Sequence, residues 1–200
     1  MSHHRFDAAY YRRHYRGRSR VHSAREVAHL CRAVDGYAAW LGLPLRRILD
    51  VGAGPGLWRD WFRRHRPAAR YRSVDVSPYA CERYGHERRD IARWRPPGRY
   101  DLVVCQGVLP YLDAREAEAA IAHLGSACRG LLYLEALTLR DLAEVADPGR
   151  TDVAIHARSG AWYRVRLRPW FRQVGAGLWV SSSSPMAFWE LEAAAGATPS

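Results

Sequence analysis

The amino-acid sequence predicts an α/β fold with a doubly wound, mostly parallel sheet. Patterns typical of buried strands and of amphipathic helices alternate from residue 47 to residue 135, and this alternation implies a parallel sheet with helices on both faces. A glycine-rich turn at residues 52–56 connects the first of these strands to the following helix. Two further strand-like segments near the end of the sequence predict a terminal antiparallel hairpin.

Seven segments have the composition and length of β-strands. Each is a short run rich in apolar, aromatic or β-branched residues, bounded by glycine, proline or polar residues. We expect strands at residues 47–51, 71–76, 86–89, 100–105, 130–135, 171–180 and 187–193. Residues 181–185, four serines and a proline, separate the last two segments, which are therefore expected to form the hairpin.

Capping residues mark the helix starts. Side chains that can accept hydrogen bonds from the first free amides stand ahead of three predicted helices, as Ser23 with Glu26, Ser77 before Pro78, and Asp113 with Glu116. Helical spacing of apolar residues predicts helices at residues 24–41, 55–66, 78–84, 114–128 and 159–167. Four aromatic residues near the N-terminus are spaced as one packed helical face, namely Phe6, Tyr10, Tyr11 and Tyr15. Residues 144–160 show no clear pattern and are expected to form a loop.

The composition indicates one domain in the cytoplasm. A length of 200 residues is typical of a single domain with a substantial core. The sequence has no apolar run long enough to span a membrane, and its first residues lack the apolar segment of a signal peptide. The four cysteines are far apart and form no CxxC pair, which favours reduced thiols, and we predict no metal site.

The glycine turn is the most informative motif. Residues 50–56 read Asp-Val-Gly-Ala-Gly-Pro-Gly, where a strand changes into a helix. Glycine lets the backbone approach a ligand closely, because it has no Cβ and tolerates positive φ. A dinucleotide-binding fingerprint requires glycine at the sixth position of the motif, which here is Leu57. The spacing argues against a nicotinamide cofactor and resembles motif I of the class I S-adenosylmethionine-dependent methyltransferases.

This resemblance covers nearly the whole chain and implies a Rossmann-like methyltransferase fold with S-adenosyl-L-methionine as cofactor. It implies that residues 1–200 form a single methyltransferase domain. Within that domain we expect an N-terminal helical cap at residues 1–44, a cofactor-binding core at residues 45–135, and substrate-side helices with the terminal hairpin at residues 136–200.

The resemblance also assigns residues to the cofactor. The glycine turn would hold its amino-acid part, Asp75 would accept both ribose hydroxyls, and Asp90 with Ile91 would contact the adenine. For Asp75 the alternative role is to cap the helix that begins near Ser77. For Asp90 the alternative is an ordinary surface position, and for Asp50 it is a cap on local amides. The expected cofactor residues are Asp50, Gly52, Ala53, Gly54, Gly56, Asp75, Val76, Asp90, Ile91, Gln106 and Gly107, with Tyr11 and Tyr15 as aromatic lids.

The methyl acceptor is less well indicated. Methyltransferases of exocyclic or amide nitrogens often carry Asn or Asp before Pro-Pro-Tyr or Pro-Pro-Phe after the fourth strand, where this sequence has Cys-Gln-Gly-Val at residues 105–108. That departure argues against the nucleobase and glutamine subclasses. Methyl transfer from a sulfonium is an in-line displacement, which needs a general base only when the acceptor arrives protonated. The candidates are Tyr111, Glu135 and His156, although a lone histidine in a loop is more often an ordinary surface residue.

The charge of the chain suggests a second kind of partner. The net charge is +11, and residues 12–20 form a basic run with an aromatic residue inside it, which is the electrostatic footprint of RNA binding. All 31 residues counted as Lys+Arg are arginine, and the sequence has no asparagine. A genome rich in G and C favours such a composition, so codon bias is the alternative explanation of this charge.

We therefore predict an S-adenosylmethionine-dependent methyltransferase that methylates an oxygen or nitrogen atom of a small molecule. One alternative is an RNA or protein methyltransferase that uses the arginine-rich N-terminal run. A second alternative is a non-catalytic protein that retains the fold and the cofactor, because fold alone does not determine function. No membrane partner is expected, and the sequence does not specify an oligomeric state.

Overall fold

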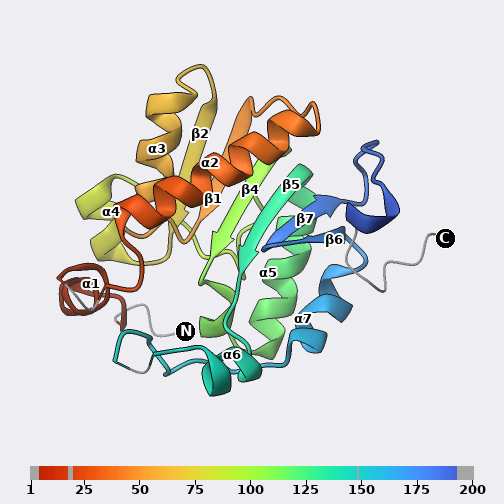
Figure 1. The fold of residues 1–200 in the computed structure, drawn as a ribbon. Coiled ribbons are helices and arrows are strands. Elements are labelled where there is room, and N and C mark those ends of the chain that lie inside the picture. Colours follow the sequence, from red (N-terminus) through yellow and green to blue (C-terminus); the bar gives the residue numbers. More distant parts are fainter. Residues whose placement is uncertain (1–4, 18–19, 148, 193–200) are drawn as a thin grey trace.

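The computed structural model describes residues 5–17, 20–147 and 149–192. Its central element is a seven-stranded sheet of order β3-β2-β1-β4-β5-β7-β6 (Figure 1). The first five strands pair in parallel, whereas β7 pairs antiparallel with β5 and with β6. The doubly wound, mostly parallel sheet with a terminal hairpin is therefore confirmed. The strands are β1 (Arg47–Val51), β2 (Arg70–Asp75), β3 (Glu87–Arg88), β4 (Tyr100–Gln106), β5 (Cys128–Glu135), β6 (Phe171–Gly175) and β7 (Leu178–Ser181).

The helices begin where the capping residues predict. The Ser23 hydroxyl accepts a hydrogen bond from the Glu26 amide at 3.1 Å, and the Glu26 carboxylate accepts one from the Ser23 amide at 2.6 Å. Asp113 and Glu116 form the same reciprocal pair. The α-helices are α1 (Ala8–Tyr15), α2 (Ala24–Trp40), α3 (Leu57–His65), α4 (Pro78–Tyr84), α5 (Ala114–Ala127), α6 (Leu139–Glu144) and α7 (Gly160–Leu167), and the short 3₁₀ helices are η2 (Leu109–Tyr111) and η3 (Glu190–Glu192).

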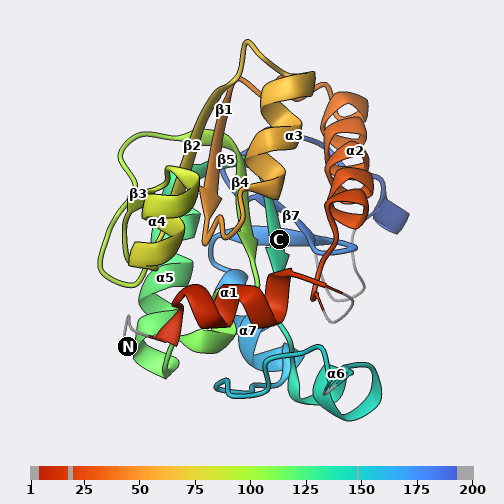
Figure 2. The same cartoon turned by 90° about the vertical axis from the view of Figure 1, so that its left-hand side faces the viewer.

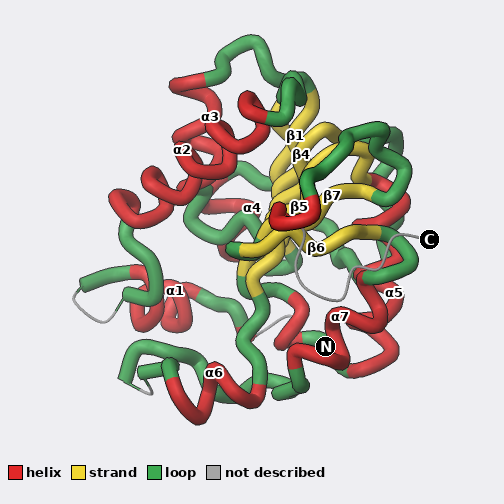
Figure 3. Tube along the Cα trace, turned by 45° about the vertical axis from the view of Figure 1, so that its right-hand side comes forward, coloured by secondary structure: helices red, strands yellow, loops and turns green. Residues whose placement is uncertain are grey.

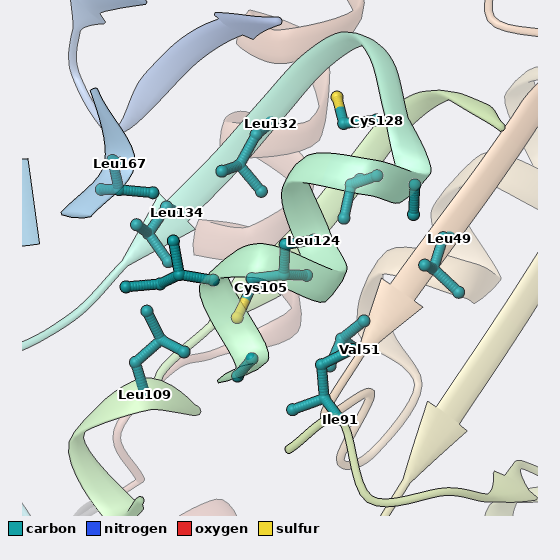
Figure 4. Close-up of a cluster of buried hydrophobic side chains, with 14 of the residues drawn as sticks. Leu49, Val51, Ile91, Cys105, Leu109, Leu124, Cys128, Leu132, Leu134 and Leu167 are labelled. Atoms are coloured by element: carbon teal, nitrogen blue, oxygen red, sulfur yellow. The ribbon is translucent and has the colours of Figure 1, made fainter. Parts of the chain in front are cut away.

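The sheet divides the core into two layers. Alternate strand residues face opposite sides, so Ile48 packs with α2 and α3, whereas Leu49 packs with α5 and α7. Figure 4 shows the second layer, in which Leu124 of α5 and Leu167 of α7 lie near the side chains of β4 and β5. Helix α2 is thus a structural layer of the sheet, although it falls within the predicted cap at residues 1–44. The division of the chain into cap, core and substrate side stays a prediction.

The terminal hairpin lies earlier in the chain than the sequence predicts. Residues 171–180, expected to be one strand, contain β6 and all of β7 except Ser181. The expected strand at residues 187–193 includes η3 instead, and its last residue lies outside the described part. The turn between β6 and β7 places Ala176 and Gly177 at φ +48° and +76°. Two positive φ values are the mark of a type I′ turn, which Asn-Gly or Asp-Gly would have signalled and Ala-Gly does not.

Two segments lie beyond the carboxyl ends of the parallel strands. Helix α1 crosses below the arrowhead of β1 in Figure 2, and α6 lies at the same end of the sheet in Figure 3. The sequence did not predict α6, which a capping box of Thr138 and Asp141 begins. The described residues between the end of α6 and Arg158 form a loop, as the sequence predicts. Within the described ranges, none of the helices combines the length and apolar character needed to cross a bilayer.

Candidate active site

A cleft lies at the carboxyl ends of β1, β2, β4 and β5, and residues of α1 line it; we name it the α1 cleft. Figure 2 shows α1 beyond the ends of these strands. In open α/β sheets, ligands bind at this edge. The cleft has a β2 half, lined by Asp75, Asp90 and Ile91 among others, and a β5 half, lined by His22 and Glu135 among others. The residues that line both halves are Tyr10, Tyr15, Gly52, Gly54, Gln106, Gly107 and Tyr111.

The glycine turn is shaped by its backbone. Gly52 and Gly54 have φ values of +69° and +54°, a region where an L side chain is strained. A Cβ on Gly52 would also overlap Cγ2 of Val108. The amides of Gly52 and Ala53 donate to the carbonyl of Val74 at 2.9 and 3.1 Å, and these bonds tie the turn to β2. Position 52 therefore requires glycine, both for its backbone conformation and because Val108 leaves no room for a Cβ.

The Asp75 carboxylate links the turn to the next helix. One oxygen accepts a hydrogen bond from the Gly54 amide at 2.9 Å, and the other accepts one from the Ser77 amide at 2.8 Å. Ser77 is the N-cap of α4, so the capping role considered for Asp75 is present. Each carboxylate oxygen can accept a further hydrogen bond, and Asp75 lines the β2 half of the cleft. Capping and ligand binding are therefore compatible at this residue.

His86 fixes the same turn from the other side, and the sequence did not indicate it. Its imidazole is buried, with Nε2 3.0 Å from the Gly54 carbonyl and Nδ1 2.9 Å from the Ser73 hydroxyl. Burial lowers the pKa of His86, which favours a neutral ring that donates from Nε2 and accepts at Nδ1. The peptide groups on both sides of Gly54 are thus held by buried side chains.

Asp50 lies beneath the turn and lines the β5 half of the cleft. Its carboxylate is 2% exposed and accepts a hydrogen bond from the Tyr71 hydroxyl at 2.9 Å. Burial raises the pKa of Asp50 to about 7, although the bond from Tyr71 opposes that shift. A positive charge that entered the cleft beside Asp50 would favour the ionised carboxylate and lower this pKa.

The β2 half also contains the other residues predicted to contact a nucleoside. Ile91 is buried and Val76 half-buried, so together they provide an apolar wall. The Asp90 carboxylate accepts a hydrogen bond from the Ala92 amide at 3.0 Å and lies 3.8 Å from Nε of Arg93. Asp90 is therefore a fixed carboxylate at the rim of the β2 half and not an isolated surface residue.

Aromatic residues of α1 close the cleft. The rings of Tyr11 and Tyr15 stack at 5.2 Å between centroids, and the Tyr15 ring lies against the glycine turn. The hydroxyls of Tyr10 and Tyr111 are 2.9 Å apart, which joins α1 to the 3₁₀ helix after β4. Burial raises the pKa of Tyr10, so this hydroxyl stays protonated at neutral pH. The predicted packed aromatic face of the N-terminal helix is confirmed.

The loop after α6 meets the N-terminal segment over the β5 half. The Arg5 guanidinium pairs with the Asp152 carboxylate at 2.8 Å, and Arg150 donates to the Arg20 carbonyl at 2.9 Å. Asp152 and Ile155 line the cleft, so the loop expected at residues 144–160 does lie over the site. These two contacts join the loop to the N-terminal segment beside the β5 half.

The three candidate bases have different positions. Glu135 and Tyr111 line the cleft. His156 is exposed and lies outside the lining residues of both halves, and only its backbone amide reaches this region, donating to the Pro110 carbonyl at 2.8 Å. The geometry therefore gives no support to His156 as a base, and that role stays a prediction. A loop without helical or strand pattern gives no means of predicting the direction of its side chain.

Comparison with known proteins identifies the family. A family model described as a methyltransferase domain matches residues 24–177. The chain belongs to this methyltransferase family. Its fold is that of the class I S-adenosylmethionine-dependent methyltransferases, and the family uses S-adenosylmethionine as methyl donor.

Individual relatives are more distant. An uncharacterized protein of Synechococcus is 32% identical over an alignment of 117 positions, which covers 50% of this chain and 27% of that protein. The matched part is thus about a quarter of the relative. The structure of magnesium protoporphyrin IX methyltransferase from Synechocystis with bound S-adenosylmethionine has a TM-score of 0.58 at 21% identity, covering 88% of this chain and 93% of that one. An S-adenosylmethionine-dependent methyltransferase from Clostridium acetobutylicum has a TM-score of 0.58 at 12% identity over 80% of this chain and 84% of that one. These structures share the fold.

Most of the residues predicted for the cofactor of this methyltransferase meet at the α1 cleft. Gly56 is the exception, since it lies outside the lining residues and serves as the N-cap of α3 in the left-handed region. Sequence reasoning missed His22, Trp58, His86 and Asp152, because each stands outside any motif and reaches the cleft region only through the fold. The role of each residue toward the cofactor stays a prediction.

The buried Asp50 predicts a pH dependence of cofactor binding by this methyltransferase. S-adenosylmethionine is cationic at its sulfonium, so it favours the ionised carboxylate and its binding should release a proton below pH 7. We expect affinity to rise with pH, being roughly tenfold lower one pH unit below the pKa of Asp50 than well above it. Calorimetric titrations at pH 6, 7 and 8 measure this. Asp50→Asn should remove the dependence, and an equal slope in that variant would contradict the assignment.

Proposed function

We propose that this methyltransferase transfers the methyl group of S-adenosylmethionine to an oxygen or nitrogen atom of a small molecule. The observation that carries the proposal is the continuity of the two halves of the α1 cleft, which share the glycine turn and the residues after β4. A cofactor with its adenosine in the β2 half would direct its sulfonium toward the β5 half. The acceptor would then lie in line with the methyl group, in a space that α1 and the loop after α6 enclose.

The enclosure favours a small acceptor. The Tyr10–Tyr111 hydroxyl contact and the Arg5–Asp152 ion pair cross the entrance to the β5 half. A folded protein or RNA would need both contacts to open, whereas a small molecule needs only a transient gap. Arg12 and Arg13 on α1 and Arg16 directly after it are exposed. An experiment must therefore distinguish RNA binding by this outer surface from methylation of a small molecule in the cleft.

The test follows a labelled methyl group. The protein is incubated with methyl-labelled S-adenosylmethionine and with the separated small-molecule, RNA and protein fractions of an extract from the source organism. We expect label in the small-molecule fraction, with activity retained when Arg12, Arg13 and Arg16 are replaced by alanine. Label in the RNA or protein fraction, lost in that triple variant, would overturn the proposal in favour of a macromolecular acceptor.

A further inference from the structure

Three segments of the chain bring polar side chains together in the β5 half of the α1 cleft. Gln106 ends β4, Glu135 ends β5, and His22 precedes α2. The indole Nε1 of Trp58 and the hydroxyl of Tyr133 also reach this group. The glycine turn takes no part in it, and of its members only Gln106 also lines the β2 half. The group therefore has a role other than holding the nucleoside.

The hydrogen bonds fix the orientation of the Gln106 amide. The Trp58 indole nitrogen is only a donor, and it lies 2.8 Å from Oε1 of Gln106. The amide nitrogen of Gln106 must therefore face the other way, where it donates to Oε2 of Glu135 at 3.0 Å. The Tyr133 hydroxyl donates to the same oxygen at 3.1 Å. With Oε2 engaged twice, Oε1 of Glu135 is left to face His22.

That arrangement selects a tautomer for His22. Its Nε2 lies 3.2 Å from Oε1 of Glu135 and 3.2 Å from the Gln106 amide nitrogen. A lone pair on Nε2 would accept from the neutral Gln106 amide but would face the charged carboxylate. The bond to the charged partner is the stronger one, so the favourable form carries the proton on Nε2 and donates it to Glu135. The nitrogen that gains and loses a proton is then Nδ1, which has no hydrogen-bond partner among the described residues. The side chain is 31% exposed and lines the cleft.

The charges around His22 support a basic imidazole. The hydrogen bond to Glu135 raises the pKa of His22 and outweighs the lowering effect of burial. Glu26 acts in the same direction and Arg150 against it. Burial alone would raise the pKa of Glu135, but its hydrogen bonds with His22, Gln106 and Tyr133 lower it, so Glu135 stays ionised. A carboxylate that orients an imidazole and increases its basicity is a recurrent arrangement for a general base.

We propose that His22 is the general base of this methyltransferase, that Glu135 positions it, and that the acceptor carries a hydroxyl group. This inference rests on the proposed function of methyl transfer to a small molecule. In the step, a lone pair of the acceptor oxygen forms the bond to the methyl carbon while the carbon–sulfur bond breaks, and that electron pair returns to sulfur to give S-adenosylhomocysteine. The hydroxyl proton passes to Nδ1 of His22 and afterwards to water.

A hydroxyl acceptor explains the base better than an amine does. A hydroxyl that attacks without losing its proton would form a protonated ether, which is a strong acid and an unfavourable product. A neutral amine forms a stable ammonium ion and can release its proton to water later. The carboxylate–imidazole pair of Glu135 and His22 is therefore the arrangement expected when the acceptor is a hydroxyl.

The test combines an isotope label on the transferred methyl group with variants of His22 and of a control histidine. Methyl-¹³C S-adenosylmethionine is supplied with the small-molecule fraction of the source extract, and the carbon shift of the product distinguishes O-methyl from N-methyl. We expect an O-methyl product, and a kcat for His22→Gln that is lower by about 100-fold or more at unchanged affinity for S-adenosylhomocysteine. His29→Gln, an exposed histidine on α2, is the matched control with unchanged rate.

The pH profile separates a base from a structural residue. In the wild-type protein kcat should rise with pH through the pKa of His22, because only the neutral ring accepts a proton. Glu135→Gln should move that rise to lower pH, because the pKa of His22 falls without its carboxylate partner. In the complex with S-adenosylhomocysteine, nitrogen NMR should show titration at Nδ1 of His22.

Three results would overturn the proposal. They are an N-methyl product, titration at Nε2, and a His22→Gln variant that keeps its rate and pH profile. If the wild-type protein binds S-adenosylhomocysteine but labels no small molecule, the proposed function fails first and the role of His22 falls with it.

Discussion

Replacing Asp75 with alanine is expected to weaken the binding of S-adenosylhomocysteine by about a hundredfold or more, as measured by calorimetric titration. Hydrogen bonds to a charged group contribute about 1.5–3 kcal/mol each, and every 1.4 kcal/mol corresponds to a factor of ten in affinity. The variant loses the predicted acceptor for the two ribose hydroxyls. It also releases the Gly54 and Ser77 amides, so the glycine turn and the start of α4 lose a shared anchor.

Two controls distinguish binding from folding for this residue. Asp75→Asn keeps one oxygen acceptor of similar shape and should lose less affinity than Asp75→Ala. Asp90→Asn tests the neighbouring predicted adenine contact without touching the glycine turn. Thermal unfolding without ligand shows whether the turn still forms. An Asp75→Ala variant that folds and binds S-adenosylhomocysteine as tightly as the wild type would show that the carboxylate is only a cap.

Gly52→Ala is expected to destabilise the protein and to remove measurable cofactor binding. An L residue at the φ of +69° observed for Gly52 costs roughly 1–2 kcal/mol. The new Cβ would also overlap Cγ2 of Val108, which is a branched side chain with little freedom to move away. The turn must shift to relieve that overlap, and its shape toward the cleft is then lost. Denaturant unfolding and calorimetric titration measure the two effects.

Matched variants separate the two causes in Gly52→Ala. Adding Val108→Ala removes the overlap and leaves the backbone strain, so the double variant should recover part of the stability. Gly36→Ala is the control for a glycine without such constraints, because it lies inside α2 with open space around it, and alanine there should stabilise the helix by about 0.5–1 kcal/mol. Equal effects of Gly52→Ala and Gly36→Ala would contradict the account of the turn.

The parallel core of the fold could be predicted because its signals are local. Buried strands, capping boxes and the glycine turn are each contained within a few residues, and all of them recur in the structure. The hairpin was misplaced because its turn uses Ala176, which rarely adopts positive φ, and because residues 187–192 have the apolar composition of a strand without a partner strand. Helix α6 was missed because it is too short for a helical pattern to be distinguished.

The site could be predicted only in part, for a related physical reason. Asp50 and Asp75 lie at the carboxyl ends of β1 and β2, and the glycines follow β1, so topology alone brings them to one edge of the sheet. His22 and His86 come from connections whose paths depend on tertiary packing, so nothing near them in the sequence indicates that they meet Glu135 or Gly54. The cofactor half of the cleft was therefore predicted better than the acceptor half.

The crystal structure of the complex with S-adenosylhomocysteine is the most direct test of the central claim, that the α1 cleft holds the methyl donor with its reacting end toward the β5 half. We predict that the ribose hydroxyls contact Asp75, that the adenine lies beside Asp90 and Ile91, and that the sulfur points toward His22 and Glu135. A ligand bound elsewhere, or one whose sulfur points away from the β5 half, would contradict the account.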